Sequence, residues 1–137
     1  MIQPETEPET VSCCTKTILL VDDEKAVRGM IRTALRAKGY RVFEASDGEE
    51  AIHISNLFAD TIALLVTDVV LPRIDGKQVA KELNKLRPET RVLFLSGYPE
   101  DTLVRHGALQ AGVNFLQKPF SIKALTSKVQ SVLDSPS

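Results

Sequence analysis

The segment Thr17-Ile18-Leu19-Leu20-Val21-Asp22-Asp23 decides the fold class, because a short apolar run ends abruptly in two adjacent carboxylates. Two other runs, at 63–66 and 92–95, are apolar throughout. Strands that are apolar on both faces are typical of a parallel sheet covered by helices on both sides. We therefore expect these three runs to be the central strands of one parallel sheet.

Two further segments, 41–45 and 113–117, mix polar with apolar residues and suit strands at the sheet edges. Apolar residues recur at helical spacing between the strands and after the last one. They are Val27, Met30, Ile31, Ala34 and Leu35, then Ala51, Ile54 and Phe58, then Val79, Leu83 and Leu86, and finally Leu125, Val129 and Val132. This alternation predicts an α/β fold of the flavodoxin-like (βα)5 type, a doubly wound parallel five-stranded sheet. Its strand order is 2-1-3-4-5 if the connections are right-handed.

Residues that start and stop helices agree with this division. Asp47 and Asp75 are suited to cap the second and third helices, Gly39 to end the first, and Pro88 to end the third. The segment 99–111 has few apolar residues to bury and an interrupting glycine, so we expect it to form the weakest and most mobile helix.

Length and composition predict one domain, since 137 residues with 43% hydrophobic content can bury one substantial core. Residues 1–15 are acidic and proline-bearing, which favours a flexible tail or interdomain linker. We place the domain at 16–134 and a short tail at 135–137. The adjacent Cys13 and Cys14 lack the spacing of a metal clip or disulfide framework and are interpreted as incidental reduced thiols.

Charge and hydropathy exclude several function classes. The chain has 17 Lys and Arg against 18 Asp and Glu, so it offers no broad basic field for nucleic acid. Its apolar runs fall far short of the roughly 20 residues needed to cross a bilayer. The first fifteen residues also lack the apolar stretch of a secretory signal. We expect a cytoplasmic protein that neither binds nucleic acid directly nor inserts into a membrane.

Polar side chains follow the predicted strands where each one ends. Asp22 and Asp23 follow the first strand, Asp68 ends the third, Ser96 follows the fourth and Lys118 follows the fifth. The carboxyl ends of parallel strands share one edge, where ligands bind in such sheets. Three carboxylates gathered there repel one another unless a cation neutralises them. Oxygen ligands without His or Cys predict Mg²⁺, for which Mn²⁺ could substitute.

Five short motifs give the chain a family resemblance. They are Leu19-Leu20-Val21-Asp22-Asp23-Glu24, Val66-Thr67-Asp68, Leu71-Pro72-Arg73-Ile74-Asp75-Gly76, Leu95-Ser96-Gly97-Tyr98 and Gln117-Lys118-Pro119-Phe120. Together, in this order and over about 16–134, the chain resembles the response-regulator receiver domains of two-component signalling. The last motif and the segment 99–112 look especially like receivers at the C-terminus of hybrid sensor histidine kinases.

The resemblance implies a role for each site residue. Asp68 would be the phosphoacceptor, attacking the phosphoryl group of a partner's phosphohistidine. The metal would be held by Asp23, Asp68 and the Val70 backbone carbonyl, with Asp22 acting through coordinated water. Lys118 would contact the phosphoryl oxygens as a point charge.

The resemblance also implies a switch. Ser96 would donate its hydroxyl to a phosphoryl oxygen, and Phe115 would then move inward and alter the face formed by the fourth helix, fifth strand and fifth helix. Val70 and Tyr98 occupy positions that tune phosphate lifetime in the family. The Lys118-Pro119 bond is similar to one that is cis in the family.

The partners implied are a histidine kinase or a histidine phosphotransfer domain, with dimerisation of receivers through the switch face as a further possibility. The isolated domain would assist its own phosphorylation and dephosphorylation without being an enzyme, although a parent protein could be a hybrid kinase. One alternative is a pseudo-receiver, which binds proteins without being phosphorylated. Another is a hydrolase with an aspartyl-phosphate intermediate. Its two aspartates would be separated by one residue, whereas Asp22 and Asp23 are adjacent.

Overall fold

The computed structural model describes residues 15–135, in which five strands alternate with five helices. The strands are β1 (Thr17–Val21), β2 (Arg41–Ala45), β3 (Leu64–Asp68), β4 (Arg91–Ser96) and β5 (Phe115–Gln117). The helices are α1 (Lys25–Ala37), α2 (Gly48–Leu57), α3 (Gly76–Leu86), α4 (Glu100–Arg105) and α5 (Ile122–Asp134). Within residues 15–135, no helix combines the length and the hydropathy of a membrane-spanning segment. Most of the predicted N-terminal linker, with Cys13 and Cys14, and residues 136–137 of the predicted C-terminal tail lie outside the described residues.

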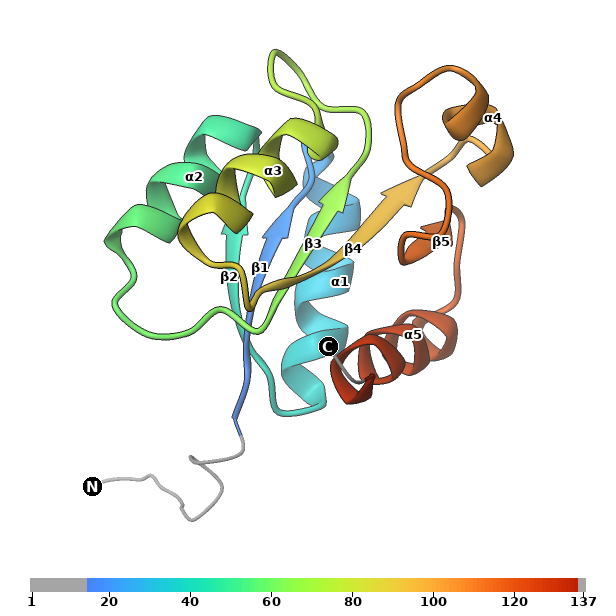
Figure 1. Ribbon diagram of the computed structural model, residues 1–137. Helices are drawn as coiled ribbons and strands as arrows, with labels where there is room; N and C mark the ends of the chain where they lie inside the picture. The colour runs from blue at the N-terminus through green and yellow to red at the C-terminus, as the bar shows by residue number, and fades with distance from the viewer. Residues whose placement is uncertain (1–14, 136–137) are drawn as a thin grey trace, which may run out of the picture.

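The sheet has the predicted order, β2-β1-β3-β4-β5, and all four pairings are parallel. The flavodoxin-like arrangement predicted from the sequence is therefore confirmed. Helices α1 and α5 cover one face of the sheet, and α2 and α3 cover the other (Figure 1). This double covering explains why β1 and β3 are buried along their whole lengths.

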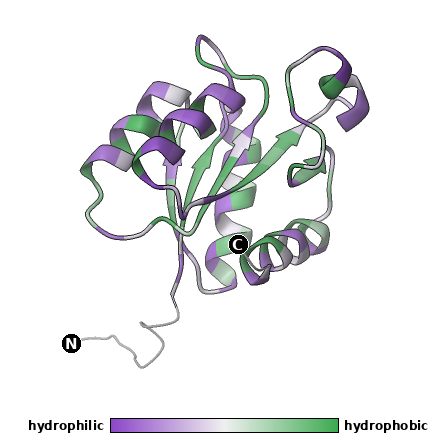
Figure 2. Ribbon diagram, in the orientation of Figure 1, coloured by the Kyte–Doolittle hydropathy of each residue, from purple (hydrophilic) through white to green (hydrophobic). Residues whose placement is uncertain are grey.

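Alternate residues of the central strands supply two separate cores. Leu20 and Val66 belong to the cluster under α1 and α5, whereas Leu19 and Leu65 belong to the cluster under α2 and α3. Figure 2 shows these strands as hydrophobic ribbons between helices that are hydrophilic over much of their length. A parallel strand buried on both faces needs an apolar residue at nearly every position, which is the pattern that identified it.

The predicted helix ends are confirmed. The Asp47 side chain accepts a hydrogen bond from Glu50 N at 2.8 Å, and the Asp75 side chain accepts one from Gln78 N at 2.9 Å. Gly39 follows α1 with a φ of 95°, a conformation that favours glycine. These contacts satisfy backbone groups that the helices leave without intrahelical partners.

Two elements are shorter than the sequence predicts. The helical part of segment 99–111 is confined to α4, because the chain turns through Gly107 at a φ of 75°. The predicted strand 113–117 narrows to Phe115–Gln117, and Gly112, with a φ of 83°, precedes the predicted strand. Both glycines take a backbone conformation that neither a right-handed helix nor a strand can continue.

Two arginines donate hydrogen bonds to backbone carbonyl groups near helix ends at the amino edge of the sheet, where the parallel strands begin. Arg87 donates to the carbonyl oxygens of Ser55 at 2.9 Å, Asp60 at 2.6 Å and Phe58, all at the end of α2 or just after it. Arg91 donates to carbonyl oxygens of Val132 and Leu133 near the end of α5. Each guanidinium thereby donates to carbonyl groups near a helix end, where intrahelical N–H donors run out; Val132 O also accepts from Ser135 N at 3.3 Å.

Candidate functional site

The carboxyl edge of the sheet gathers the predicted polar residues. Asp68 is the last residue of β3 and Ser96 the last of β4, while Asp22 directly follows β1 and Lys118 directly follows β5. The Lys118 ammonium lies 2.7 Å from Asp68 Oδ1 and 3.1 Å from Asp22 Oδ2. Asp22 and Lys118 are 46 and 50 residues away from Asp68 in the sequence, yet both lie beside it in the fold.

The three carboxylates of the cluster form one group. Asp22, Asp23 and Asp68 each offer an oxygen, and these oxygens lie within 4.8 Å of one another. Asp22 is fully buried and Asp68 is 5% exposed, whereas Asp23 is open to solvent. The cluster therefore has a buried floor and an accessible side.

Asp68 carries the strongest perturbation in the site. Burial, and then the neighbouring Asp22 carboxylate, raise the pKa of Asp68 to about 8, although Lys118 acts in the opposite direction. Its buried Oδ1 accepts no hydrogen bond of suitable geometry from the described residues, even though Lys118 forms an ion pair with it. A buried carboxylate oxygen without a hydrogen bond is costly in a folded protein and is frequent at functional sites.

Lys118 is held in place from both ends. Its backbone N–H donates to Ser96 O at 2.8 Å, and its bond to Pro119 is cis. Burial lowers the pKa of the Lys118 ammonium, but its close ion pair with Asp68 and the charge of Asp22 outweigh burial, so the pKa is raised overall. The side chain therefore remains a cation at neutral pH.

This arrangement fits a hard divalent cation. All three candidate ligands are carboxylates, and the buried Asp68 Oδ1 lacks a hydrogen bond. Both Asp22 oxygens already accept hydrogen bonds, Oδ1 from Glu24 N at 2.9 Å and Oδ2 from Lys118 Nζ. Magnesium prefers oxygen ligands and few protein carboxylates, which this set can supply.

The other predicted residues lie on β3, β4 and β5 or just after them. Ser96 is buried, and its hydroxyl oxygen accepts a hydrogen bond from Tyr98 N at 3.0 Å. The side chains of Val70 and Tyr98 are 58% and 60% exposed. Phe115 is half-buried and packs against the core under α2 and α3. Ser96 thus faces the interior, whereas Val70 and Tyr98 face solvent.

Two residues that contact the site have roles that sequence reasoning missed. A Cβ atom at Gly76 would lie 1.9 Å from Asp68 O, so only glycine allows α3 to start against the end of β3. Arg28 donates to Asp22 O at 2.7 Å. The sequence identified Asp75-Gly76 as a helix start and as the end of a family motif, without its contact with Asp68, and nothing in the spacing of Arg28 signals its contact.

The fold and this edge define a class of protein, the doubly wound α/β domains with an acidic site at the carboxyl ends of the strands. Within that class the family is specific, because the model of the response regulator receiver domain matches residues 18–130. The chain belongs to this family. The family resemblance predicted from the five motifs is thereby confirmed.

Relatives of known name support the same assignment. The chain is 43% identical over 119 residues to the sensor kinase CckA of Brucella abortus (strain 2308), which covers 86% of this chain and 12% of that protein. It is 34% identical over 117 residues to the response regulator MprA of Mycolicibacterium vanbaalenii, with coverage of 85% and 49%. The chain therefore spans less than half the length of either relative.

Solved structures show the same fold. The receiver domain of the hybrid histidine kinase CckA superimposes with a TM-score of 0.73 at 42% identity, covering 86% of this chain and 99% of that one. The chemotaxis protein CheY4 of Vibrio cholerae gives a TM-score of 0.76 at 26% identity, with coverage of 86% and 98%. The chain is a receiver domain homologous to those of two-component signalling proteins.

Proposed function

We propose that Asp68 accepts a phosphoryl group from the phosphohistidine of a histidine kinase or a histidine phosphotransfer domain. The observation that carries this proposal is the buried Asp68 Oδ1, which lacks a hydrogen bond and lies beside Lys118 and two further carboxylates. A carboxylate oxygen would form the new bond to phosphorus, while the phosphorus–nitrogen bond breaks and the imidazole leaves.

Asp23, Asp68 and the Val70 backbone carbonyl would hold Mg²⁺, and Mn²⁺ could replace it. Asp22 would act through a coordinated water, because Glu24 N and Lys118 Nζ already occupy its two oxygens. Bound metal would neutralise negative charge on the transferring group. The exposure of Asp23 leaves the cluster open on the side from which a phosphodonor would approach.

Lys118 would contact the phosphoryl group in addition to its ion pair with Asp68. In the structure its ammonium bridges Asp22 and Asp68, so it already lies beside the oxygen that would carry the phosphoryl group. Its raised pKa keeps it charged across the physiological range. This charge would offset that of the aspartyl phosphate.

The response would spread through Ser96 and Phe115 to the face formed by α4, β5 and α5. The Ser96 hydroxyl would leave Tyr98 N and donate to a phosphoryl oxygen, and Phe115 would move further into the interior. The small size of α4 and β5 supports this direction, because few buried contacts hold that region. The same face would serve for dimerisation, and exposed Val70 and Tyr98 would tune phosphate lifetime.

The biological context we propose is cytoplasmic, with residues 16–134 as the receiver unit. The unit would belong to a hybrid sensor histidine kinase or act as a single-domain regulator. In isolation it would assist its own phosphorylation and dephosphorylation without being an enzyme. The similarity to CckA supports the hybrid context, since that relative is a sensor kinase and the solved structure is its receiver domain.

Phosphorylation can be tested with acetyl phosphate and Mg²⁺, followed by peptide mapping of a hydroxylamine-sensitive adduct. We expect the adduct on Asp68, its loss in Asp68→Asn, and its retention in the control Asp101→Asn, whose side chain is 80% exposed. A parent protein without an adduct, indistinguishable from Asp68→Asn, would favour the pseudo-receiver.

The assigned roles of Asp23 and Lys118 can be separated by NMR. Asp23→Asn should weaken Mg²⁺ binding by about 10-fold and slow phosphorylation, because it removes a charged ligand. Lys118→Ala should reduce the change around Phe115 after phosphorylation. Unchanged Mg²⁺ affinity in the first variant, or an intact response in the second, would contradict the corresponding role.

A further inference from the structure

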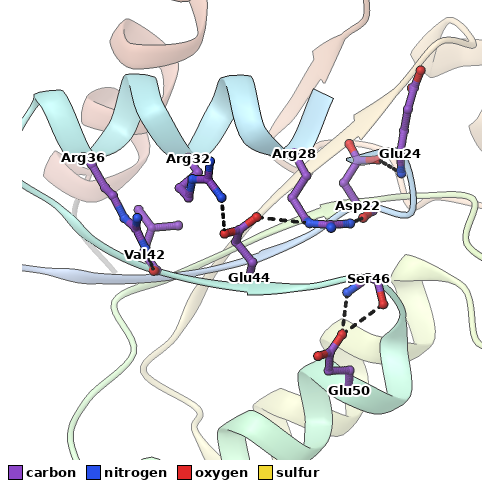
Figure 3. A network of polar contacts seen from close by, with 9 residues as sticks. All are labelled: Asp22, Glu24, Arg28, Arg32, Arg36, Val42, Glu44, Ser46 and Glu50. Atoms are coloured by element: carbon purple, nitrogen blue, oxygen red, sulfur yellow. Dashed lines mark hydrogen bonds and ion pairs between the residues drawn. The ribbon is translucent and has the colours of Figure 1, made fainter. Parts of the chain in front are cut away.

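A network of arginines connects the acidic cluster to the edge strand β2. Arg28, near the start of α1, donates from Nη1 to Asp22 O at 2.7 Å and from Nε to Glu44 Oε1 at 3.2 Å (Figure 3). Glu44 lies on β2, and the Arg28 side chain is only 15% exposed. One guanidinium thus joins β2 to the chain just beyond β1.

Glu44 fixes this guanidinium because a second arginine holds its other oxygen. Arg32, one helical turn after Arg28, donates to Glu44 Oε2 at 2.7 Å. Burial raises the pKa of Glu44, but the hydrogen bonds and charges of Arg32 and Arg28 outweigh burial, so the pKa is lowered overall. Glu44 is therefore an anion at neutral pH with both oxygens engaged.

The contact from Arg28 completes the restraint on Asp22. Asp22 N donates to Ala45 O at 3.2 Å, and Asp22 Oδ1 accepts from Glu24 N. With its carbonyl oxygen held by Arg28, the backbone of Asp22 is restrained on both sides. The peptide that Arg28 grips also joins Asp22 to Asp23, so its orientation affects both carboxylates of the cluster.

We propose that Arg28 is a positioning residue for the acidic cluster and that Glu44 on β2 holds Arg28 in place. This inference rests on the proposed function, because it concerns the affinity of the cluster for Mg²⁺. Arg28 would not touch the metal or the phosphoryl group. It would fix the peptide from which the Asp22 and Asp23 side chains project, as residues behind metal ligands commonly do.

The same helix offers a matched control. Arg36, two turns after Arg28, also donates to a backbone carbonyl, that of Val42 on β2 at 3.0 Å. Its contact has the same chemistry as that of Arg28 but does not reach the cluster. Arg28→Met and Arg36→Met each remove one guanidinium that binds a carbonyl; Arg28→Met also removes the ion pair with Glu44, and Glu44→Gln measures that part separately.

The test is a titration with MgCl₂ alone, read by calorimetry and by the carbonyl ¹³C resonance of Asp22. We expect Arg28→Met to raise the dissociation constant about 10-fold, Glu44→Gln to raise it about threefold, and Arg36→Met to change it less than about twofold. The Asp22 carbonyl resonance should shift in the first two variants and remain unchanged in Arg36→Met. Arg28→Lys should recover part of the affinity, because it keeps the charge without the forked donors.

Each outcome is decisive. Equal Mg²⁺ affinities in Arg28→Met and Arg36→Met, beside a parent that binds Mg²⁺, would overturn this inference and leave the proposed function intact. A parent that does not bind Mg²⁺ would overturn the proposed function as well. If Arg28→Met does not fold, Arg28→Lys and Glu44→Gln decide in its place, and parental affinity with an unshifted Asp22 carbonyl resonance in both would overturn the inference.

Discussion

The amino and carboxyl ends of the parallel strands form two opposite edges of the sheet, and these edges differ in how their polar groups are satisfied. At the amino edge, Arg87 and Arg91 turn inward and satisfy the carbonyl groups at the ends of two helices. At the carboxyl edge, Asp68 keeps a buried oxygen without a hydrogen bond and a pKa raised to about 8. The amino edge stabilises the fold, whereas the carboxyl edge retains unfavourable electrostatics that a ligand can relieve.

Breaking the amino edge should have the largest effect on stability. Arg87→Ala removes a guanidinium that serves three carbonyl groups and Ser55 Oγ, and it should lower the free energy of unfolding by about 3 kcal/mol. Urea denaturation measures this loss. Mg²⁺ affinity should stay near that of the parent at temperatures where the variant is folded.

Arg105→Ala is the control for Arg87→Ala. Its side chain is 71% exposed and its ion pair with Asp101 spans 3.9 Å, so the loss should stay below about 0.5 kcal/mol. Equal losses in the two variants would show that the amino edge has no special role in stability.

Neutralising Asp68 at the carboxyl edge should raise the free energy of unfolding, whereas Arg87→Ala should lower it. Asp68→Asn removes a buried charge beside Asp22 and should raise the free energy of unfolding by about 2 kcal/mol at pH 8 without Mg²⁺. Asp101→Asn, at an exposed position, should leave it unchanged within about 0.5 kcal/mol. A less stable Asp68→Asn protein would mean that the ion pair with Lys118 outweighs the strain on Asp68.

The effect of Asp68→Asn should depend on pH in a defined direction. The pKa of Asp68 is about 8 in the folded protein against 3.8 ordinarily, so its stabilising contribution is complete below about pH 4. That contribution is lost as the pH rises towards 8. The advantage of Asp68→Asn over the parent should therefore grow between pH 5 and pH 8 in urea titrations, and a constant difference would contradict the raised pKa.

Binding of Mg²⁺ should stabilise the carboxyl edge and so reduce its electrostatic difference from the amino edge. At a concentration ten times its dissociation constant, Mg²⁺ should stabilise the parent by about 1.4 kcal/mol. The gain at that same concentration should be smaller in Asp23→Asn, because one carboxylate of the cluster is missing. Thermal unfolding with and without MgCl₂ measures both gains, and equal gains would remove Asp23 from the site.

Among the predicted site residues, the smallest effect on stability is expected at Ser96. Ser96→Ala removes only the acceptor for Tyr98 N and should cost about 0.5 kcal/mol. After phosphorylation, however, the NMR shift at the Phe115 amide should be reduced in Ser96→Ala and kept in Ser96→Thr, which retains the hydroxyl. The same shift in both variants would exclude Ser96 from the switch.

The strands of the sheet could be predicted from the sequence because a strand buried on both faces appears as a continuous apolar run. The apolar runs at 63–66 and 92–95 could not suit an exposed strand, and their positions in β3 and β4 followed. The helix caps at Asp47 and Asp75 were equally local, since each carboxylate meets an N–H three residues later.

The clustering of Asp22, Asp68 and Lys118 could be predicted because each follows or ends a parallel strand, but contacts of side chains with distant backbone carbonyl groups could not. Arg87 meets carbonyl groups 27 to 32 residues away, and a carbonyl group has the same chemistry in every residue. The contact of Arg28 with Asp22 O is invisible for the same reason. The end of α4 depended on the backbone angle of Gly107, which composition does not specify.

The close approach of Gly76 to Asp68 gives the domain a mechanical asymmetry. A Cβ atom at position 76 would lie 1.9 Å from Asp68 O and 3.1 Å from Val69 Cα, so the start of α3 has no room to slide against the end of β3. We expect these two segments to move together. If phosphorylation displaces the Asp68 side chain, we expect the displacement to spread away from α3, towards α4 and β5, which bury fewer residues.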